Sequence, residues 1–471
     1  MRVPRSTVRV GAGLLMVLPL TGGLARAADE PAAGERILAA ARTDSRAYEK
    51  LAWLTDRIGH RLSGSQNLER AVAWAAAELR RDGIEHVWTE EVQVPRWIRG
   101  REHARIVSPT EHRMTILALG GSVPTPTGGI SGEVIEVDSL DALRSAGDRV
   151  HGKIVLFNRE MQRGLNVENG YGAVSPLRVD GPAEAGKLGA LAALVRSLGT
   201  ANFRLPHTGA THYPEGGPAI PAAAVSAEDA MLIARLLRAG ETVRVELELG
   251  CKTLPDVPSA NVLAEIRGRE RPEEIVVIGA HLDSWDVGTG AIDDGAGCAM
   301  VLETMRLVRR LGLVPRRTLR AILFTNEENG LRGGRDYAER HLAEMPRHVA
   351  AIESDLGGAP PIGFGVSAGP DGAEIVRALV APLADLGVKE VFPRGGGADI
   401  SPMRKHGVPQ IGHLPDPATY FDYHHTEADT LDKVDRAALD LNVAALAYLA
   451  YALADAETPL PRLEPDVEPR P

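Results

Sequence analysis

Cysteine and aromatic residues are scarce in this chain. Only two cysteines, Cys251 and Cys298, occur among its 471 residues, and aromatic residues make up 4%. Disulfide-rich folds need several cysteine pairs, so the fold is not a disulfide scaffold. A single disulfide between the two thiols stays an open alternative. Cys298 lies in a helical pattern, however, where a small buried residue is the simpler interpretation.

Positive charge is also limited. The chain has 53 Lys and Arg against 63 Asp and Glu, a formal net charge of −10. Basic residues form only short pairs such as Arg316-Arg317, and this excludes the basic patches typical of nucleic-acid partners. The length and the 44% hydrophobic content suffice for one large domain or two moderate ones.

Long hydrophobic runs are missing as well. The N-terminal run "VGAGLLMVLPLTGGL" is too short and too rich in glycine for a membrane span. Basic residues precede it, and Ala25-Arg26-Ala27 follows as a small-residue cleavage site. This order predicts a secretory signal peptide at residues 1–27 and a secreted or periplasmic mature protein. A retained N-terminal anchor is the alternative, and no later segment is expected to span a membrane.

The apolar pattern divides the rest of the chain into four parts. Residues 28–114 combine amphipathic helices with strands, and residues 115–250 alternate strands and helices like a small inserted α/β domain. Residues 251–458 form a regular strand–helix series, and residues 459–471 form a Pro-rich tail. The predicted fold class is α/β, with a mostly parallel mixed sheet covered by helices on both faces.

One stretch, "AHLDSWDVGTGAIDDGAG" at residues 280–297, holds one His and four Asp. Acidic residues this dense repel one another unless a cation lies among them, so the stretch is a solvated loop or a metal site. Further acids and histidines follow later predicted strands or lie in a late loop: Glu327-Glu328, Asp355 and His424-His425. Ligands in such sheets bind at the carboxyl ends of the strands, so these residues are expected to converge.

The residue types fit zinc chemistry. Histidine nitrogen and carboxylate oxygen are common zinc ligands. Two histidines and three carboxylates can hold two metals about 3.5–4 Å apart if one carboxylate bridges them. The adjacent glutamates offer one ligand and one general base. Each signal has a plainer explanation by itself, such as an Asp-Asp-Gly turn or a solvated Glu-Glu pair, and only their joint order favours a metal site.

This order of motifs resembles the MH-clan co-catalytic zinc exopeptidases, the aminopeptidase and glutamate carboxypeptidase family. The matching motifs are H-x-D, an Asp-Asp pair, Glu-Glu, a later Asp, and "HTEADT". The resemblance implies the zinc exopeptidase fold and two Zn²⁺ per chain, with Asp293 as the bridging ligand. The other implied ligands are His281, Glu328, Asp355 and His425. It also implies that Glu327 is the general base, that Asp283 orients His281, and that the Asp293–Asp294 peptide is cis.

Residues 115–250 are similar to the protease-associated insert domain of the carboxypeptidase Q sub-family, through "GKIVLFN", "PHTGA" and "IPAAAVSAEDA". "GADI" and the doubled His424-His425 agree with this. The similarity implies dipeptide substrates with free termini and a homodimer. His424 and Asp399 are then candidate substrate-binding residues. The Asp399 carboxylate suits a substrate ammonium, or equally the N-cap of a following helix.

The leading prediction is an exported di-zinc metallo-exopeptidase that acts on dipeptides or short peptides. The loop at residues 206–217 is a candidate lid over its site, with a remote interaction domain as the alternative for the insert. An aminopeptidase with the same metal centre is the nearest alternative function. A metal-free, receptor-like binding protein and a one-zinc glutaminyl cyclase are others, and the complete ligand set argues against both. The loops carry no readable code for the substrate side chains.

Overall fold

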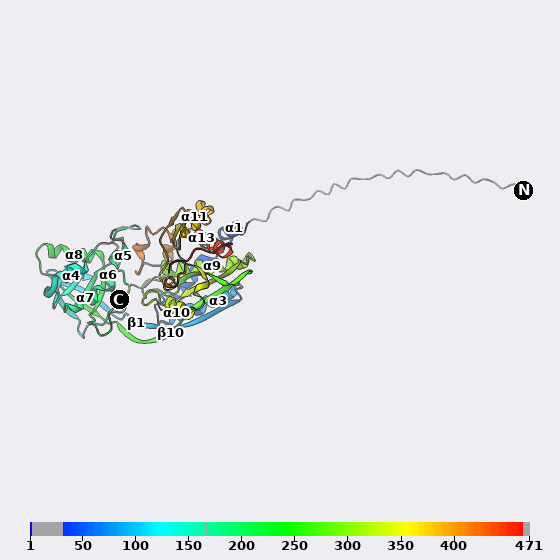
Figure 1. Cartoon of the computed structure of the whole chain (residues 1–471). Coiled ribbons are helices and arrows are strands. Elements are labelled where there is room, and N and C mark those ends of the chain that lie inside the picture. Colours follow the sequence, from blue (N-terminus) through cyan, green and yellow to red (C-terminus); the bar gives the residue numbers. More distant parts are fainter. Residues whose placement is uncertain (2–31, 165–167, 465–471) are drawn as a thin grey trace. The chain divides into compact units, whose positions relative to one another are not determined.

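A computed structural model describes Met1, residues 32–164 and residues 168–464. The predicted signal peptide and the end of the predicted tail lie outside the described residues. From Ala33 onward the chain forms one compact unit, drawn in Figure 1. Two eight-stranded sheets account for the strands among the described residues.

The first sheet has the strand order β1-β10-β12-β11-β13-β16-β14-β15. Its four central strands run parallel: β12 (Arg317–Phe324), β11 (Arg271–His281), β13 (His348–Glu353) and β16 (Gln410–Pro415). An antiparallel pair extends one edge: β10 (Lys252–Ile266) and β1 (His86–Ile98). The other edge is formed by β14 (Pro361–Ser367), antiparallel to β16, and β15 (Glu390–Phe392).

Helices cover both faces of this sheet, because its strands are apolar on both sides. In β11, Val276 and Ile278 pack into one hydrophobic cluster, whereas Ile275 and Val277 pack into another. The first cluster is covered by α1 (Ala33–Asp44), α2 (Ala47–Trp53), α3 (Gln66–Arg81), α9 (Ala296–Arg310), α11 (Gly372–Val380) and α13 (Arg436–Asp455). The second is covered by α10 (Arg332–Arg340) and the 3₁₀ turn Ser401–His406. The predicted α/β fold class is confirmed.

Helix α13 corrects one expectation. Among the described residues it alone is long and apolar enough to cross a membrane, although no such segment was expected after the N-terminus. Its apolarity has another cause in this fold: 72% of its most apolar window is buried, and it packs against α1 and α9. A helix that is hydrophobic all round is typical of a buried core position.

The second sheet has the order β3-β2-β9-β5-β6-β7-β8-β4. Its strands are β2 (Glu102–Ser108), β3 (His112–Met114), β4 (Ile116–Ala118), β5 (Ile130–Val137), β6 (Ile154–Phe157), β7 (Ala192–Arg196), β8 (Ala222–Val225) and β9 (Arg244–Leu249). Its helices are α4 (Leu140–Ala146), α5 (Tyr171–Val174), α6 (Pro176–Val179), α7 (Gly181–Lys187) and α8 (Ala227–Arg238). The sheet begins at β2, ahead of residue 115, and the domain boundaries given above stay a prediction.

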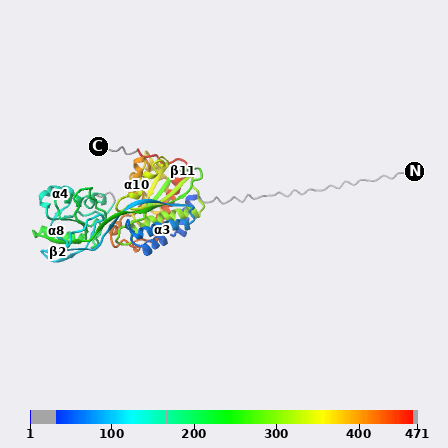
Figure 2. The same cartoon turned by 90° about the horizontal axis from the view of Figure 1, so that it is seen from below.

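The chain crosses from one sheet to the other at two connections, and these two connections are adjacent in space. Strand β1 leads into β2, and β9 leads into β10, so both connections lie beside each other, as Figure 2 shows for the long strands. The backbone N–H of Gly250 donates to the carbonyl of Arg101 over 2.7 Å. Gly100 has a φ of +75°, and a Cβ there would collide with the Gly250 carbonyl. Glycine is therefore required where the two connections approach each other.

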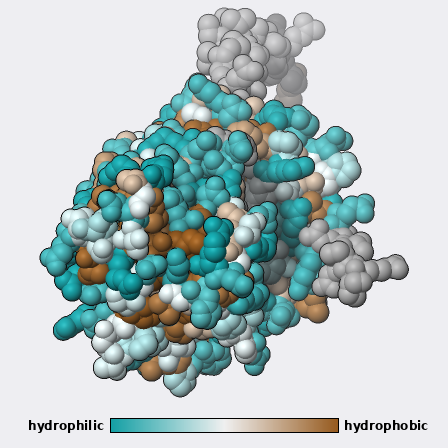
Figure 3. All heavy atoms as spheres, turned by 90° about the vertical axis from the view of Figure 1, so that its left-hand side faces the viewer, coloured by the Kyte–Doolittle hydropathy of each residue, from teal (hydrophilic) through white to brown (hydrophobic). Residues whose placement is uncertain are grey.

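Both cysteines are buried and free, so they do not form a disulfide. They lie in different hydrophobic clusters. Cys298 donates from Sγ to the carbonyl of His281 over 3.0 Å, which agrees with the interpretation of a small buried residue. The face drawn in Figure 3 is mostly hydrophilic, with apolar side chains interspersed, as expected for a surface in contact with water.

Candidate metal centre

Three neighbouring parallel strands deliver four of the predicted residues to one edge of the first sheet. His281 is the last residue of β11 and lies opposite Phe324, the last residue of β12. Glu327 and Glu328 follow in the turn after β12, where Asn326 adopts a φ of +64°. Asp355 follows β13 by two residues. The convergence expected from the strand ends is therefore observed.

Asp293 lies between two groups of potential ligands. It belongs to the turn Ala291–Gly295, between β11 and α9, and its peptide bond to Asp294 is cis, as the resemblance implies. Its Oδ1 lies 3.1 Å from Nε2 of His281, and its Oδ2 lies 3.1 Å from Nε2 of His425. The two oxygens of one carboxylate thus face two different histidines.

A second carboxylate accompanies each histidine. Oδ1 of Asp355 lies 3.4 Å from Nε2 of His281. Oε2 of Glu328 lies 2.9 Å from Nε2 of His425. The nitrogen and oxygen atoms therefore form two sets of donors that share Asp293.

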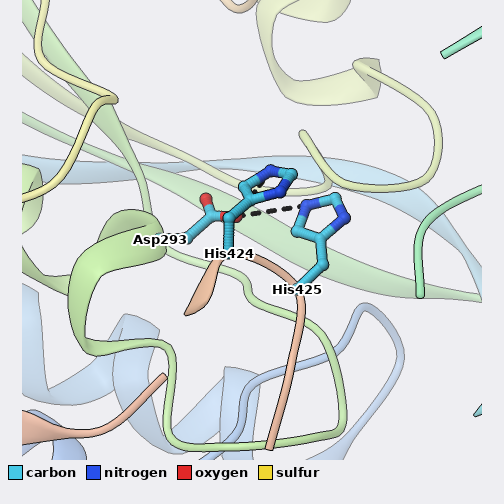
Figure 4. A group of neighbouring side chains, drawn as sticks. All are labelled: Asp293, His424 and His425. Atoms are coloured by element: carbon cyan, nitrogen blue, oxygen red, sulfur yellow. Dashed lines mark ion pairs between the residues drawn. The ribbon is translucent and has the colours of Figure 1, made fainter. Parts of the chain in front are cut away.

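His424 also lies in this cluster. Figure 4 shows His424 and His425 approaching the Asp293 carboxylate from one segment. The Nε2 atom of His424 lies 3.4 Å from Oδ2 of Asp293, and its ring stacks on His425 with centroids 3.6 Å apart. The sub-family resemblance predicts a substrate-binding role for His424. The geometry makes it a candidate metal ligand too, because donor atoms of Asp293, His424 and His425 lie within 4.8 Å of one another.

The electrostatics of the cluster fit a cation. Burial disfavours the charged form of each acid here. Burial and the charge of Asp293 raise the pKa of Glu328 to about 7, and burial with Asp355 raises the pKa of Glu327 well above its usual range. Oε1 of Glu328 is buried and accepts no hydrogen bond from the residues that the structure describes. Divalent metal ions would neutralise these acids and occupy the open oxygen, so the donor set fits metal binding.

Asp283 connects His281 with the Glu327-Glu328 turn. Its Oδ1 accepts a hydrogen bond from the Glu327 backbone N–H over 3.0 Å, and its Oδ2 accepts one from Glu328 over 3.3 Å. Nδ1 of His281 lies 3.1 Å from the Asp283 carbonyl and 3.7 Å from its Oδ1. Asp283 therefore contacts all three residues, which supports the orienting role proposed for it.

Four positioning residues were not predicted from the sequence. The carboxylate of Asp429 accepts hydrogen bonds from the backbone N–H groups of Ala291 and Ile292, both over 2.7 Å. Asp294 accepts from the His281 backbone N–H over 3.1 Å. Both acids belong to the matched motifs, and this signal could have identified them. The other two, Arg61 and Ser63, had no comparable signal.

Asp399 is fully buried and does not line the cavity beside the metal centre, although its neighbour Ala398 does. Its carboxylate accepts no hydrogen bond from the described residues. Burial and the charge of Glu353 raise its pKa well above the usual range. It does not cap the following turn, because Ile400 holds that position without a side-chain bond. Substrate binding by Asp399 stays a prediction, without a contact that supports it.

A cavity of about 730 Å³ opens beside the acids and histidines. Part of its wall comes from the second-sheet region: Tyr171, Arg178, Val179, Ala210, Thr211 and His212. Three of these belong to the loop at residues 206–217, predicted as a lid. The loop therefore lies at the site.

Comparisons with known proteins agree with this geometry. Residues 261–450 match the model of Peptidase family M28. Carboxypeptidase Q of Bos taurus is 40% identical over 421 residues, which cover 89% of this chain and 88% of that protein. A peptidase M28 precursor of Shewanella amazonensis is 39% identical, with a TM-score of 0.87, over 92% of this chain and 98% of that chain.

A zinc aminopeptidase from Bacillus subtilis has a TM-score of 0.64 over 88% of this chain and 95% of that chain. At 19% identity this shows a common fold alone. The resemblance inferred from the motifs is confirmed by the matches of higher identity.

Proposed function

The chain belongs to peptidase family M28, and we propose that it is an exported di-zinc exopeptidase that hydrolyses dipeptides or other short peptides. The observation that carries the proposal is the position of Asp293, whose two carboxylate oxygens face His281 and His425 separately. A carboxylate placed in this way suits a bridge between two metals. The relative matched over 88% of its length is by name a carboxypeptidase, which supports an exopeptidase.

Two ligand sets follow from the distances. His281 and Asp355 would hold one zinc ion, His425 and Glu328 would hold the other, and Asp293 would bind both. His424 lies close enough to Asp293 to be an additional ligand on the second side. When bound, the metals supply Lewis acidity that polarises the scissile carbonyl and the attacking water.

Glu327 is the proposed general base. Its backbone N–H is fixed by Asp283, and its side chain lines the cavity beside Asp293 and Asp355. It accepts the proton of the attacking water and transfers it to the amine nitrogen that leaves. Asp283 acts through Glu327, Glu328 and His281, and so is a positioning residue.

Export and assembly are separate parts of the proposal. The basic, apolar and small-residue order of residues 1–27 supports removal of a signal peptide. Mass spectrometry of the protein secreted or released from the periplasm should give an N-terminus near Ala28. A homodimer is proposed from the sub-family resemblance, and sedimentation of the purified protein tests it.

Hydrolysis of defined substrates tests the activity. The purified protein should cleave a free dipeptide, contain about two zinc ions per chain, lose activity on chelation and recover it with zinc. Parallel assays with an aminoacyl p-nitroanilide and a C-terminally amidated peptide separate the aminopeptidase mode from the dipeptidase mode. If none of these peptides were cleaved in a metal-dependent way, the proposal would be overturned.

A further inference from the structure

His424 and His425 reach the metal centre by a different route from the other candidate ligands, which lie at or after the ends of parallel strands. Strand β16 ends at Pro415, and a loop and the short helix α12 (Tyr420–Tyr423) separate it from the two histidines. The end of a strand therefore does not fix where these histidines lie. Their position depends on the contacts of the segment at residues 416–425, from which both rings extend in Figure 4.

Asp422 makes two of these contacts. Its side chain lies in α12 and is 8% exposed. Its Oδ1 accepts a hydrogen bond from Nη2 of Arg163 over 2.5 Å and another from Oγ1 of Thr200 over 2.6 Å. Both donors belong to the second-sheet region, residues 102–249. Hydrogen bonds to an ionised carboxylate are stronger than those between neutral groups, so Asp422 ties its segment firmly to this region.

The two donors also contact the backbone beside Asp422. The backbone N–H of Thr200 donates to the carbonyl of Phe421 over 3.1 Å, and Nη1 of Arg163 donates to the carbonyl of Ala418. The Phe421 ring stacks on Tyr171, another residue of the second-sheet region, with ring centroids 5.0 Å apart. Side-chain, backbone and ring contacts therefore converge on the residues just before the two histidines.

Thr208 of the same region contacts His425, so the segment is held on both sides of His424. His424 itself has no outer partner that would orient its ring: its Nδ1 is buried and forms no hydrogen bond with the described residues. Metal-binding histidines are commonly oriented by a hydrogen bond at the nitrogen away from the metal. Without that bond, the place of His424 depends on how the backbone around it is held.

The Arg163–Asp422 ion pair differs from local pairs of the second-sheet region. The pairs Arg144–Asp141 and Lys187–Glu184 join side chains three positions apart on one helix. Arg163 and Asp422 are 259 positions apart, and the carboxylate is nearly buried. Exposed local pairs contribute little, whereas a buried carboxylate that loses its donors leaves an uncompensated charge. The long-range pair is thus suited to fix the segment that carries the histidines.

We propose that Asp422 is a positioning residue for the metal centre: through Arg163 and Thr200 it fixes the segment of His424 and His425, and tight binding of the zinc ion on the His425 side requires this contact. The inference rests on the proposed di-zinc function and deepens it. The zinc ion on the side of His281 and Asp355 depends on strand ends, so it should respond less. The second-sheet region would then control one of the two zinc ions.

Asp422→Ala tests the proposal, because alanine removes the acceptor of both hydrogen bonds. Stepwise competition with a zinc chelator gives one dissociation constant for each ion. We expect one constant to rise by about 10–100-fold, as after loss of an outer partner in other metal sites, and the other to rise by less than about threefold. The kcat at low free zinc should fall, and added zinc should restore it.

Two backgrounds assign the effect to one side of the metal centre. Asp355→Asn removes a ligand of the zinc ion on the His281 side, and Asp422→Ala should still weaken the ion that remains. Glu328→Gln removes a ligand on the His425 side. In this background Asp422→Ala should change the affinity for the remaining ion by less than about threefold.

Three further variants serve as comparisons. Asp422→Asn keeps an acceptor for Thr200 but loses the charge opposite Arg163, so its zinc constants should lie between those of the wild type and Asp422→Ala. Arg163→Met removes the cation, and its loss should not multiply with that of Asp422→Ala in the double variant. Arg144→Met removes an exposed cation of α4 that pairs with Asp141, and it should leave both zinc constants unchanged.

The failures are distinguishable. A wild type that binds fewer than two zinc ions overturns the di-zinc part of the proposed function. If the wild type binds two, unchanged zinc constants in Asp422→Ala overturn the positioning role. Equal losses of both ions overturn it too, because they indicate a general loss of stability, and so does a selective loss that persists in Glu328→Gln. Arg163→Met, whose replaced side chain is 43% exposed, keeps the test available if Asp422→Ala does not fold.

Discussion

Thr208 and His425 pair with each other, although 217 positions separate them in the chain. The backbone N–H of Thr208 donates to the His425 carbonyl over 3.0 Å, and Nδ1 of His425 lies 3.2 Å from the Thr208 carbonyl. When Nδ1 donates this bond, Nε2 keeps its lone pair on the side of Asp293 and Glu328. The loop at residues 206–217, which belongs to the part of the chain that forms the second sheet, thus sets the tautomer of His425, a candidate metal ligand beside the first sheet.

The first prediction concerns this loop. Replacement of residues 210–216 by two glycines removes part of the cavity wall but keeps Thr208 and its contact with His425. We expect KM for dipeptides to rise by about tenfold and longer peptides to become substrates, with zinc content unchanged, because the wall limits substrate length. Steady-state kinetics on peptides of two to five residues measures this. If the loop variant and the wild type had the same kinetics on peptides of every length, the loop would not act as a lid.

The second prediction concerns Asp293. Asp293→Ala removes a donor from both candidate ligand sets at once, so both zinc ions should bind more weakly. Elemental analysis after dialysis is expected to give well under one zinc per chain. Asp141→Ala is the control, because this side chain is 91% exposed in α4. Two tightly held zinc ions in Asp293→Ala would rule out the bridging role.

The third prediction separates the base from the ligands. Glu327→Gln keeps the size and hydrogen-bonding capacity of the side chain but cannot accept a proton. We expect zinc content near the wild-type value and a kcat lowered by about 10²–10⁴-fold. Glu328→Gln, in contrast, should lose both activity and zinc, because Glu328 lies against His425. Full activity in Glu327→Gln would assign the base to another residue.

The fourth prediction concerns pH, at a site remote from the metals. Burial lowers the pKa of His348 from 6.5 to about 4, and its Nε2 lies 2.7 Å from the Tyr337 hydroxyl. Between these two values the unfolded chain binds a proton that the folded protein does not. The stabilisation from His348 is therefore present above about pH 6.5 and is lost as the pH falls toward 4.

Urea unfolding at pH 7 and pH 5 measures this effect. The wild type should lose about 2 kcal/mol more than His348→Gln over this interval, since one pKa unit corresponds to about 1.36 kcal/mol. The comparison between the two proteins cancels the pH dependence of the metal centre. Equal losses in both proteins would show that His348 does not carry this part of the pH dependence.

The convergence of His281, Asp293, Glu327, Glu328 and Asp355 could be predicted from the sequence, because each lies at or after the end of a parallel strand and such strands end at one edge of the sheet. His424 and His425 instead follow the short helix α12 (Tyr420–Tyr423). Two elements in or beside the first sheet, β10 and α10, could not be predicted from the sequence. Strand β10 contains "LPDVPSAN", whose prolines and polar residues conceal a strand; among the described strands this segment pairs with β1, whereas β12 pairs with the residues that follow it. Helix α10, "RGGRDYAER", is short and mostly polar, and its apolar side chains Tyr337 and Ala338 stabilise it by tertiary packing.

Contacts of the buried polar residues were also beyond sequence reasoning. Arg61 and Ser63 lie in "GHRLSGS", a segment with no motif of its own. Ser63 Oγ accepts from Asn326 over 3.0 Å and lies 3.3 Å from Asp283, which only the folded backbone reveals. Local spacing identifies candidate ligands, whereas the residues that hold them come from distant parts of the chain.

Arg61 is the subject of the last prediction. It is fully buried, and its Nε and Nη1 donate over 2.7 Å to the carbonyls of Leu282 and Thr289. Nη2 donates over 2.9 Å to the carbonyl of Gly290. These carbonyls flank the loop that runs from Asp283 toward Asp293, so one guanidinium holds the segment between the two acids.

Arg61→Met leaves these carbonyls buried without donors, and we expect unfolding free energy to fall by about 3 kcal/mol or more. The loosened loop should also weaken zinc binding by about 10–100-fold, as loss of an outer partner does in other metal sites. Competition with a zinc chelator measures the affinity below the unfolding transition, and Arg144→Met is the exposed control. Lower stability with unchanged zinc affinity would mean that Arg61 supports the fold and not the metal centre. Arg61→Lys can replace only part of the hydrogen-bond donors of Arg61. Its unfolding free energy and its zinc affinity should therefore lie between those of the wild type and those of Arg61→Met.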